Sequence, residues 1–220
     1  MAIRTYFRIG PTCAWTMFKT GGRFFLVSNY QISKKDKLLF INKGFSHLRT
    51  VKSLRRSLYG EVFVQKEFNE FINLRDRQLL GGGLRIKWDE MERIKLFPEQ
   101  LQFAMGIGLM WEREVIDAGA DGTQGDPIHN TLALLLRSTN YVVLKWTPKE
   151  SLAILTTAYF QVDTRRASDY RILARTTLRV ALTKRLELTV DVNLRHDSEP
   201  PGGVKALDLD LVNGFSYRFK

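Results

Sequence analysis

The feature that most constrains this chain is a regular alternation of apolar and polar side chains, clearest in residues 206–219. Every second residue from Leu207 to Phe219 is apolar or aromatic, with Asn213 as the exception. The residues between them are mostly small, polar or charged, and include Asp208 and Asp210. Since successive side chains of a β-strand point to opposite faces, the segment is predicted to be a strand with one apolar and one wet face. The closing strands of outer-membrane β-barrels are built in this way, with lipid on one side and the lumen on the other.

The same two-faced pattern recurs along most of the chain. It covers residues 24–33, 38–49, 55–71, 76–88, 101–113, 131–147, 151–163, 169–183, 186–196 and 206–219. Many of these segments exceed the ~5–6 residues usual in soluble sheets and match the ~9–11 residues that cross a bilayer at a tilt. The sequence therefore predicts an all-β fold, an antiparallel up-and-down transmembrane-type β-barrel of about 10–12 strands.

The barrel domain is expected to span residues 23–220. Residues 1–22 show no clear period and are set apart as an N-terminal segment of uncertain structure. They contain Arg4, Arg8 and Lys19, and Pro11 interrupts their apolar residues, so they do not form the apolar core of a signal peptide. We expect that the first strands are missing or degenerate and that the given sequence lacks its true start.

Composition narrows the function classes. The chain has a formal net charge of +11 at pH 7, which alone would suit a partner such as nucleic acid or anionic lipid. Its basic residues, however, are dispersed through the predicted strands, and no nucleic-acid motif is present, so we expect no nucleic acid as a partner. No apolar run of about 18 residues occurs, which excludes a transmembrane helix but not a barrel strand. With one cysteine and three scattered histidines, no internal disulfide, metal site or cofactor is expected.

Three short motifs could suggest chemistry, and each has a plainer interpretation. The glycines at 81–83 lack the Lys-Ser/Thr of a phosphate loop and are interpreted as a bend or a close approach within a strand. Asp117, Asp121 and Asp126 lack the remaining ligands of a calcium loop, so a flexible loop is favoured. Ser46-His47 and His196-Asp197-Ser198 are not triads by themselves, because neighbours on a strand point to opposite faces.

Charged residues on the face opposite the apolar one are the best functional candidates. If residues 169–183 and 186–196 pair as a hairpin, the arginines of the first segment face acids of the second, which is favourable. Because arginines leave little lumen in a barrel of about 10–12 strands, a salt-bridged plug is favoured over a selective pore. The expected lumen-facing charge network comprises Glu61, Glu67, Arg77, Arg85, Arg171, Arg175, Arg179, Glu187, Asp191, Arg195, Asp208 and Asp210.

Several blocks of residues resemble a known bacterial family, the proteins with domain of unknown function 481, some of which are called salt-induced outer-membrane proteins. The resemblance starts at Asn29 and implies an outer-membrane β-barrel without catalytic residues. Two features depart from the family pattern, the remnant Gly10-Pro11-Thr12 of an expected turn and the terminal Lys220 in place of phenylalanine. The blocks are Asn29-Tyr30, Lys43-Gly44-Phe45, His47-Leu48-Arg49, Glu61-Val62-Phe63-Val64-Gln65 with Glu67, Asn69 and Phe71, residues 74–77 and 80–85, Asp169-Tyr170-Arg171, residues 186–198, Pro200-Pro201 and Tyr217-Arg218-Phe219.

The sequence thus predicts a monomeric, non-catalytic barrel in the outer membrane of a Gram-negative bacterium. It would be structural or narrowly permeable, with a charge-paired lumen, and its partners would be outer-membrane lipid and the outer-membrane assembly machinery. A soluble barrel that binds an apolar ligand inside is the first alternative, and it requires the apolar face to point inward. An outer-membrane lipid hydrolase is the second, and it requires a serine and a histidine within hydrogen-bond reach.

Overall fold

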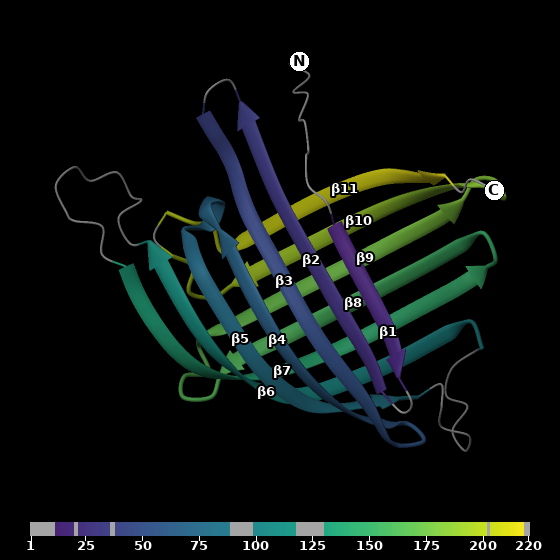
Figure 1. Ribbon diagram of the computed structural model, residues 1–220, viewed down its shortest axis with the longest axis horizontal. Helices are drawn as coiled ribbons and strands as arrows, with labels where there is room; N and C mark the ends of the chain where they lie inside the picture. The colour runs from purple at the N-terminus through teal and green to yellow at the C-terminus, as the bar shows by residue number, and fades with distance from the viewer. Residues whose placement is uncertain are drawn as a thin grey trace.

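The computed structural model describes residues 12–19, 22–35, 38–88, 99–117, 130–201 and 203–217, and they form one antiparallel sheet (Figure 1). Within these residues no helix is long and apolar enough to span a membrane. A single 3-10 turn, η1 (Glu70–Ile72), joins β4 to β5. The strands are β1 (Thr12–Lys19), β2 (Gly22–Lys35), β3 (Leu38–Arg55), β4 (Leu58–Asn69), β5 (Leu74–Lys87), β6 (Leu101–Asp117), β7 (Asn130–Lys149), β8 (Leu152–Asp163), β9 (Tyr170–Ala181), β10 (Leu186–Asp197) and β11 (Leu207–Tyr217).

The predicted all-β, up-and-down architecture is confirmed. Strands that are consecutive in the sequence are neighbours in the sheet, in the order β1 to β11, and all pairs are antiparallel. The ten segments expected from the alternation correspond to β2–β11. The sheet also starts ahead of residue 23, because β1 pairs with β2 from Thr12↔Asn29 to Lys19↔Gly22.

The sheet curls so that its first strands cross in front of its last strands (Figure 1). Side chains join the two walls across the interior. The Arg49 guanidinium of β3 donates to the Tyr159 hydroxyl of β8 at 3.2 Å, and the Tyr141 hydroxyl of β7 donates to Glu61 of β4 at 2.6 Å. The described residues of β1 and β11 form no ladder with each other.

Glycines allow β5 and β6 to approach closely, as the interpretation of residues 81–83 predicted. Gly83 lies opposite Gly108, and a Cβ atom on Gly83 would lie 2.3 Å from the carbonyl oxygen of Ile107. A Cβ atom on Gly108 would lie 2.5 Å from the carbonyl oxygen of Gly82. Larger residues would therefore push the two backbones apart at this position.

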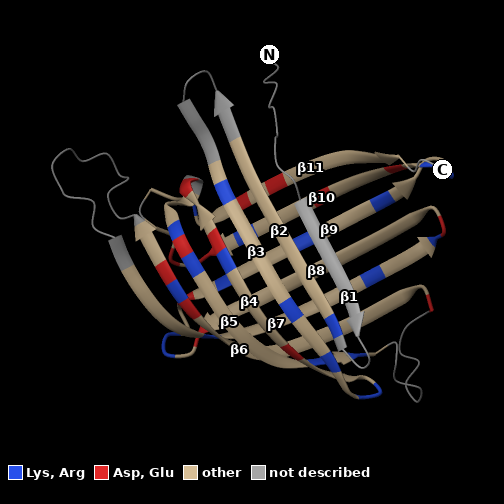
Figure 2. Ribbon diagram, in the orientation of Figure 1, with Lys and Arg blue, Asp and Glu red and all other residues tan. Residues whose placement is uncertain are grey.

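The distribution of apolar and charged side chains between the two faces of the sheet is the inverse of that in a soluble protein. Large apolar side chains are exposed on the outer face, among them Val62 at 58%, Ile107 at 57% and Trp111 at 60%. The inner face instead buries charge, and Arg137 and Glu112 are among the largest fully buried side chains. Figure 2 shows charged residues distributed along the strands as well as in the connections between them. Soluble proteins almost never bury such groups unless they are paired.

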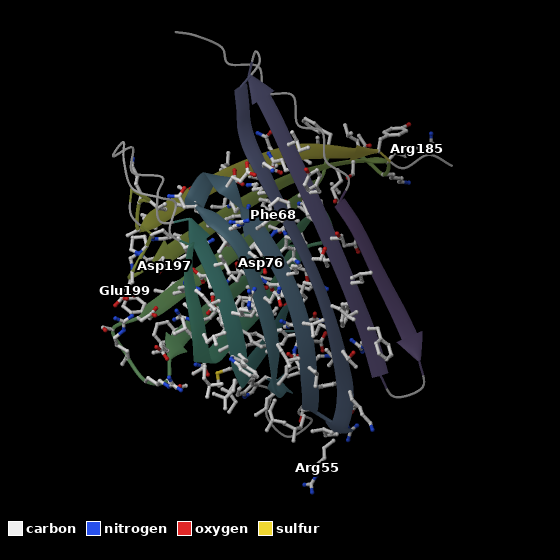
Figure 3. The ribbon with its side chains drawn as sticks, turned by 60° about the vertical axis from the view of Figure 1, so that its left-hand side comes forward. Arg55, Phe68, Asp76, Arg185, Asp197 and Glu199 are labelled. Atoms are coloured by element: carbon white, nitrogen blue, oxygen red, sulfur yellow. The ribbon has the colours of Figure 1, made fainter. Side chains whose placement is uncertain are left out.

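The connections between strands fall into two sets, one at each end of the sheet, which we call the loop end and the turn end. The loop end carries residues 70–73, 164–169 and 198–206, whereas the turn end carries the short connections 56–57, 150–151 and 182–185. Figure 3 labels Asp197 and Glu199 at the loop end and Arg185 at the turn end. The connection between β5 and β6 also lies at the turn end, and most of it is outside the described residues.

Candidate functional site in the barrel interior

The buried carboxylate of Glu112 is the centre of the interior. Inward-facing side chains of β6 alternate as Gly106, Gly108, Met110 and Glu112, so the glutamate follows a run of small or apolar residues. Glu112 has no exposed surface and accepts hydrogen bonds from Arg137 Nε and Arg171 Nη1, each at 2.6 Å. Arg77 Nε lies 2.6 Å from the same carboxylate. Since β5 and β7 flank β6, their arginines reach Glu112 diagonally, whereas Arg171 of β9 reaches it across the interior.

Further carboxylates surround these arginines. Arg171 donates to Glu114 at 2.9 Å and, through Nε, to Asp197 at 2.7 Å. Arg137 forms a two-pronged interaction with Asp169, at 2.8 and 2.9 Å. We call this set the loop-end cluster, and it consists of Arg77, Glu112, Glu114, Arg137, Asp169, Arg171 and Asp197. Each of these residues is at least 95% buried.

The loop-end cluster joins strands that are not all neighbours. Its members come from β5, β6, β7, β9 and β10 and from the β8–β9 connection. Taking ions out of water costs several kcal/mol each, and a buried pair recovers this only with good geometry and further hydrogen bonds. The hydrogen bonds that Arg137 and Arg171 donate to Glu112 meet that condition, whereas Arg77 contributes an ion-pair contact without hydrogen-bond geometry. The cluster therefore places charged side chains in the interior at the loop end, and each of these charges depends on its partners for stabilisation.

A second group, the mid-strand cluster, lies nearer the middle of the strands and comprises Arg49, Glu61, Arg85, Tyr141 and Tyr159. Glu61 lies 3.5 Å from Arg49 Nη1 and 3.6 Å from Arg85 Nη1. The Arg49 guanidinium also lies 5.6 Å from the centroid of the Tyr141 ring. These contacts connect β3 and β4 with β7 and β8, so they hold the two walls together.

Space remains on the other side of the interior. A cavity of about 230 Å³ separates β2–β4 from β9–β11, and we call it the interior cavity. Asp191 projects into it and is held by Thr177, at 2.5 Å, and by Arg175, at 3.1 Å. Its other lining residues include Asn29, Gln31, Lys43, Glu67, Asn69, Asn193 and Asp210.

Most residues of the expected charge network lie in the loop-end cluster, the mid-strand cluster or the interior cavity. Arg77 and Arg171 belong to the loop-end cluster, and Glu61 and Arg85 to the mid-strand cluster. Glu67 of β4 lies 3.9 Å from Arg195 of β10, a second link between the walls.

The remaining expected residues are less closely gathered. Arg175, Asp191 and Asp210 line the interior cavity. Arg179, Glu187 and Asp208 lie on the inner face by their register, and none of them forms an ion pair within the part of the chain that the structure describes.

Sequence reasoning missed the most buried members. Glu112 lies on the same face of β6 as Ala104 and Gly106, but the expected network did not include it. Arg137 stands alone among apolar and hydroxyl residues of β7, and Asp169 lies just outside a strand. The available signal was Arg137, whose nearest neighbours on the same face, Leu135 and Thr139, carry no charge. A charge on such a face needs a partner on another strand.

The motifs that suggested other chemistry are not assembled as sites. His47 shares a hydrogen bond of 3.0 Å with Gln65 on the inner face, whereas the exposed Ser46 lies on the outer face. Ser198 donates to the carbonyl oxygen of Ser168, while the His196 ring packs against Tyr170. No cluster of histidine, cysteine and acidic residues suited to a metal ion occurs in the described ranges. The loop that carries Asp121 and Asp126, for which a flexible loop was favoured over a calcium site, lies outside the described residues.

Comparison with known proteins decides the family. A family model described as "Protein of unknown function, DUF481" matches residues 17–219. The chain belongs to the DUF481 family. The predicted resemblance is therefore confirmed, and the match includes part of β1 of this DUF481 chain. No curated protein matches it.

A solved structure of a porin, NanC in a rhombohedral crystal form, is similar to this DUF481 chain in fold. The TM-score is 0.54 with 11% sequence identity, and the match covers 96% of this chain and 92% of that one. At this identity the likeness concerns the fold alone, which is that of a porin-like β-barrel. What the interior of this DUF481 chain does must follow from its own residues.

Proposed function

We propose that this DUF481 chain is an integral β-barrel protein of the Gram-negative outer membrane. It is structural or narrowly permeable, has no catalytic activity and acts as a monomer. The observation that carries the proposal is the inversion of its faces, with exposed leucine, valine and tryptophan outside and buried ion pairs inside. A bilayer is the environment in which such an outer face is favourable.

Aromatic side chains at two levels of the outer face support a bilayer position. Toward the loop end, the rings of Tyr30 and Phe68 lie 6.0 Å apart. Toward the turn end, those of Trp88 and Phe103 lie 5.2 Å apart. Aromatic girdles at both membrane interfaces are typical of barrels, and the apolar rows lie between these two levels.

The interior supports the second half of the proposal. The loop-end cluster occupies one side of the lumen with paired charges, and the polar interior cavity occupies the other. Such an interior leaves at most a narrow aqueous path beside a salt-bridged plug. The interior cavity is lined mainly by polar side chains, which does not favour a barrel that binds an apolar ligand. The interior also brings no serine and histidine together among the described residues, so it does not favour a lipid hydrolase.

Two leucines provide a matched test of the membrane position. Leu109 lies in the middle of β6 and Leu54 near the turn end of β3, and their exposed fractions are almost equal, at 53% and 52%. In a bilayer, Leu109→Lys should lower the free energy of unfolding by about 2–4 kcal/mol, whereas Leu54→Lys should cost about 0–1 kcal/mol. In a water-soluble protein both changes should cost less than about 0.5 kcal/mol.

The measurement is urea unfolding of the full chain refolded in lipid vesicles, followed by tryptophan fluorescence. Extraction of the native protein provides the second readout, and we expect it to require detergent. Equal effects of the two substitutions, together with extraction into water without detergent, would overturn the proposal.

A further inference from the structure

A row of polar side chains crosses the outer face of β2–β6 beside the apolar band. Lys66 of β4 pairs in register with Gln78 of β5, which in turn pairs with Arg113 of β6. The row continues to β3 and β2 through Ser46 and Ser28, whose hydroxyls share a hydrogen bond of 3.0 Å. Charged groups on a lipid-facing surface are costly at the membrane centre and cost little at the interface, so this row marks an interfacial level.

An apolar groove lies directly beneath this row. The next row toward the turn end has the register Leu26, Leu48, Val64, Leu80 and Trp111, and it is apolar throughout. These side chains, together with Ser46, Lys66, Gln78 and Arg113 of the polar row, line a groove of about 550 Å³ on the outer face. The groove is lined mainly by apolar side chains and has a cationic rim, the chemistry of a site for an acyl chain that ends in an anionic headgroup.

The rim carries an excess of positive charge that is accessible. Arg113 Nη1 lies 3.0 Å and Lys66 Nζ lies 3.5 Å from the carboxylate of Asp76. Gln78 also donates to Asp76, at 2.8 Å. Two cations thus share one carboxylate, which leaves a net positive charge. The side chain of Lys66 is 67% exposed and that of Arg113 is 45% exposed, so both can turn donors toward a ligand.

We propose that this groove is a binding site for an anionic, phosphate-bearing lipid of the leaflet at the loop end. Lys66 and Arg113 hold the phosphate, and Leu26, Leu48 and Trp111 contact the acyl chain. The inference rests on the proposed membrane position and adds to it a specific lipid class at a specific place. A headgroup without a net negative charge would leave the excess charge of the rim without a partner.

Trp111 reports directly on occupancy of the groove because it is 60% exposed there. The full chain with Trp15, Trp88 and Trp146 changed to phenylalanine is refolded in phosphatidylcholine vesicles. Dibrominated phosphatidic acid or dibrominated phosphatidylcholine is then titrated as a quencher. Because the rim carries a net positive charge, we expect dibrominated phosphatidic acid to quench Trp111 fluorescence at an about fivefold lower mole fraction than dibrominated phosphatidylcholine.

The double variant Lys66→Gln/Arg113→Gln should abolish this preference. The control Lys52→Gln/Lys184→Gln removes the same charge from the outer face of β3 and from the β9–β10 turn, and it should leave the preference intact. Heat-dependent migration on gels checks that each variant is folded.

Each other outcome has a distinct meaning. Equal quenching by both lipids overturns the site and leaves the proposed function standing, since the face would then contact any lipid. Displacement of the brominated acid by millimolar inorganic phosphate would make the rim a phosphate-ion site and overturns the lipid assignment. No quenching by either lipid overturns both the site and the membrane position.

Discussion

At the residue scale, the interior depends on a carboxylate that several cations share. Arg77, Arg137 and Arg171 all contact Glu112, and each of them is at least 96% buried. Arginine cannot lose its proton in a protein, so these charges have no means of becoming neutral. Their tolerance of burial therefore rests on the acids around them, and Glu112 is the acid that all of them share.

Replacement of Glu112 by glutamine should therefore be severe. Glu112→Gln leaves buried guanidinium groups with less negative charge, and breaking a buried ion pair in this way costs about 3–5 kcal/mol. The measurement is urea unfolding of the refolded protein in vesicles. Glu150→Gln, at an exposed position in the β7–β8 turn, makes the same chemical change and should cost less than about 0.5 kcal/mol. Similar values for the two variants would contradict the role given to Glu112.

At the element scale, the pairing of β5 with β6 depends on close backbone approach. Gly83 lies opposite Gly108, and a Cβ atom on either glycine would lie within 2.5 Å of a backbone carbonyl oxygen of the neighbouring strand. The register has little freedom, because a shift by one residue would move Glu112 to the lipid side and Trp111 to the interior.

Addition of one methyl group should reveal this constraint. Gly83→Ala places a Cβ atom against the backbone of Ile107, which cannot rotate away, and should cost about 1–3 kcal/mol. Gly214→Ala in β11 is the control, because a Cβ atom there would meet nothing within 4 Å. Folding yield and urea midpoint in vesicles measure both variants. Equal tolerance at the two positions would contradict the close approach.

At the scale of the whole molecule, polar and charged side chains link the early strands β3 and β4 to the late strands β7, β8 and β10 across the interior. Arg49–Tyr159, Tyr141–Glu61 and Glu67–Arg195 each link an early strand to a late one. These links cross the lumen and therefore also restrict it. The interior cavity next to Glu67 is the place where a narrow path could run.

Truncation of a wall-to-wall link should widen that path. Arg195→Ala removes the long side chain that faces Glu67 and should raise the conductance of the protein in planar bilayers above that of the unmodified chain. Arg185→Ala, in the exposed β9–β10 turn, removes an identical group away from the lumen and should leave the conductance unchanged. If both variants conduct like the original, the interior cavity is not part of a permeation path.

The sequence by itself determined the architecture and the sides of the sheet. Alternation has the period of a strand and is a local property, so the strands from β2 to β11, their order and the outward position of residues such as Leu109 and Trp111 could all be predicted. The resemblance to the DUF481 family was equally accessible, because it is carried by the residues themselves.

Only the tertiary structure decided which inward charges meet. Arg171 reaches Glu112 although a pair of strands separates β9 from β6, and Glu67 lies near Arg195 only because the sheet curls. Those distances depend on the curvature and tilt of the strands and on how closely neighbouring backbones approach at glycines. Small contributions from many strands add up, and they leave no periodic signal in the sequence. For the same reason the loop-end cluster and the groove with its cationic rim could not be predicted from the sequence. The alternation of apolar and polar residues predicts only the two faces of the sheet on which they lie.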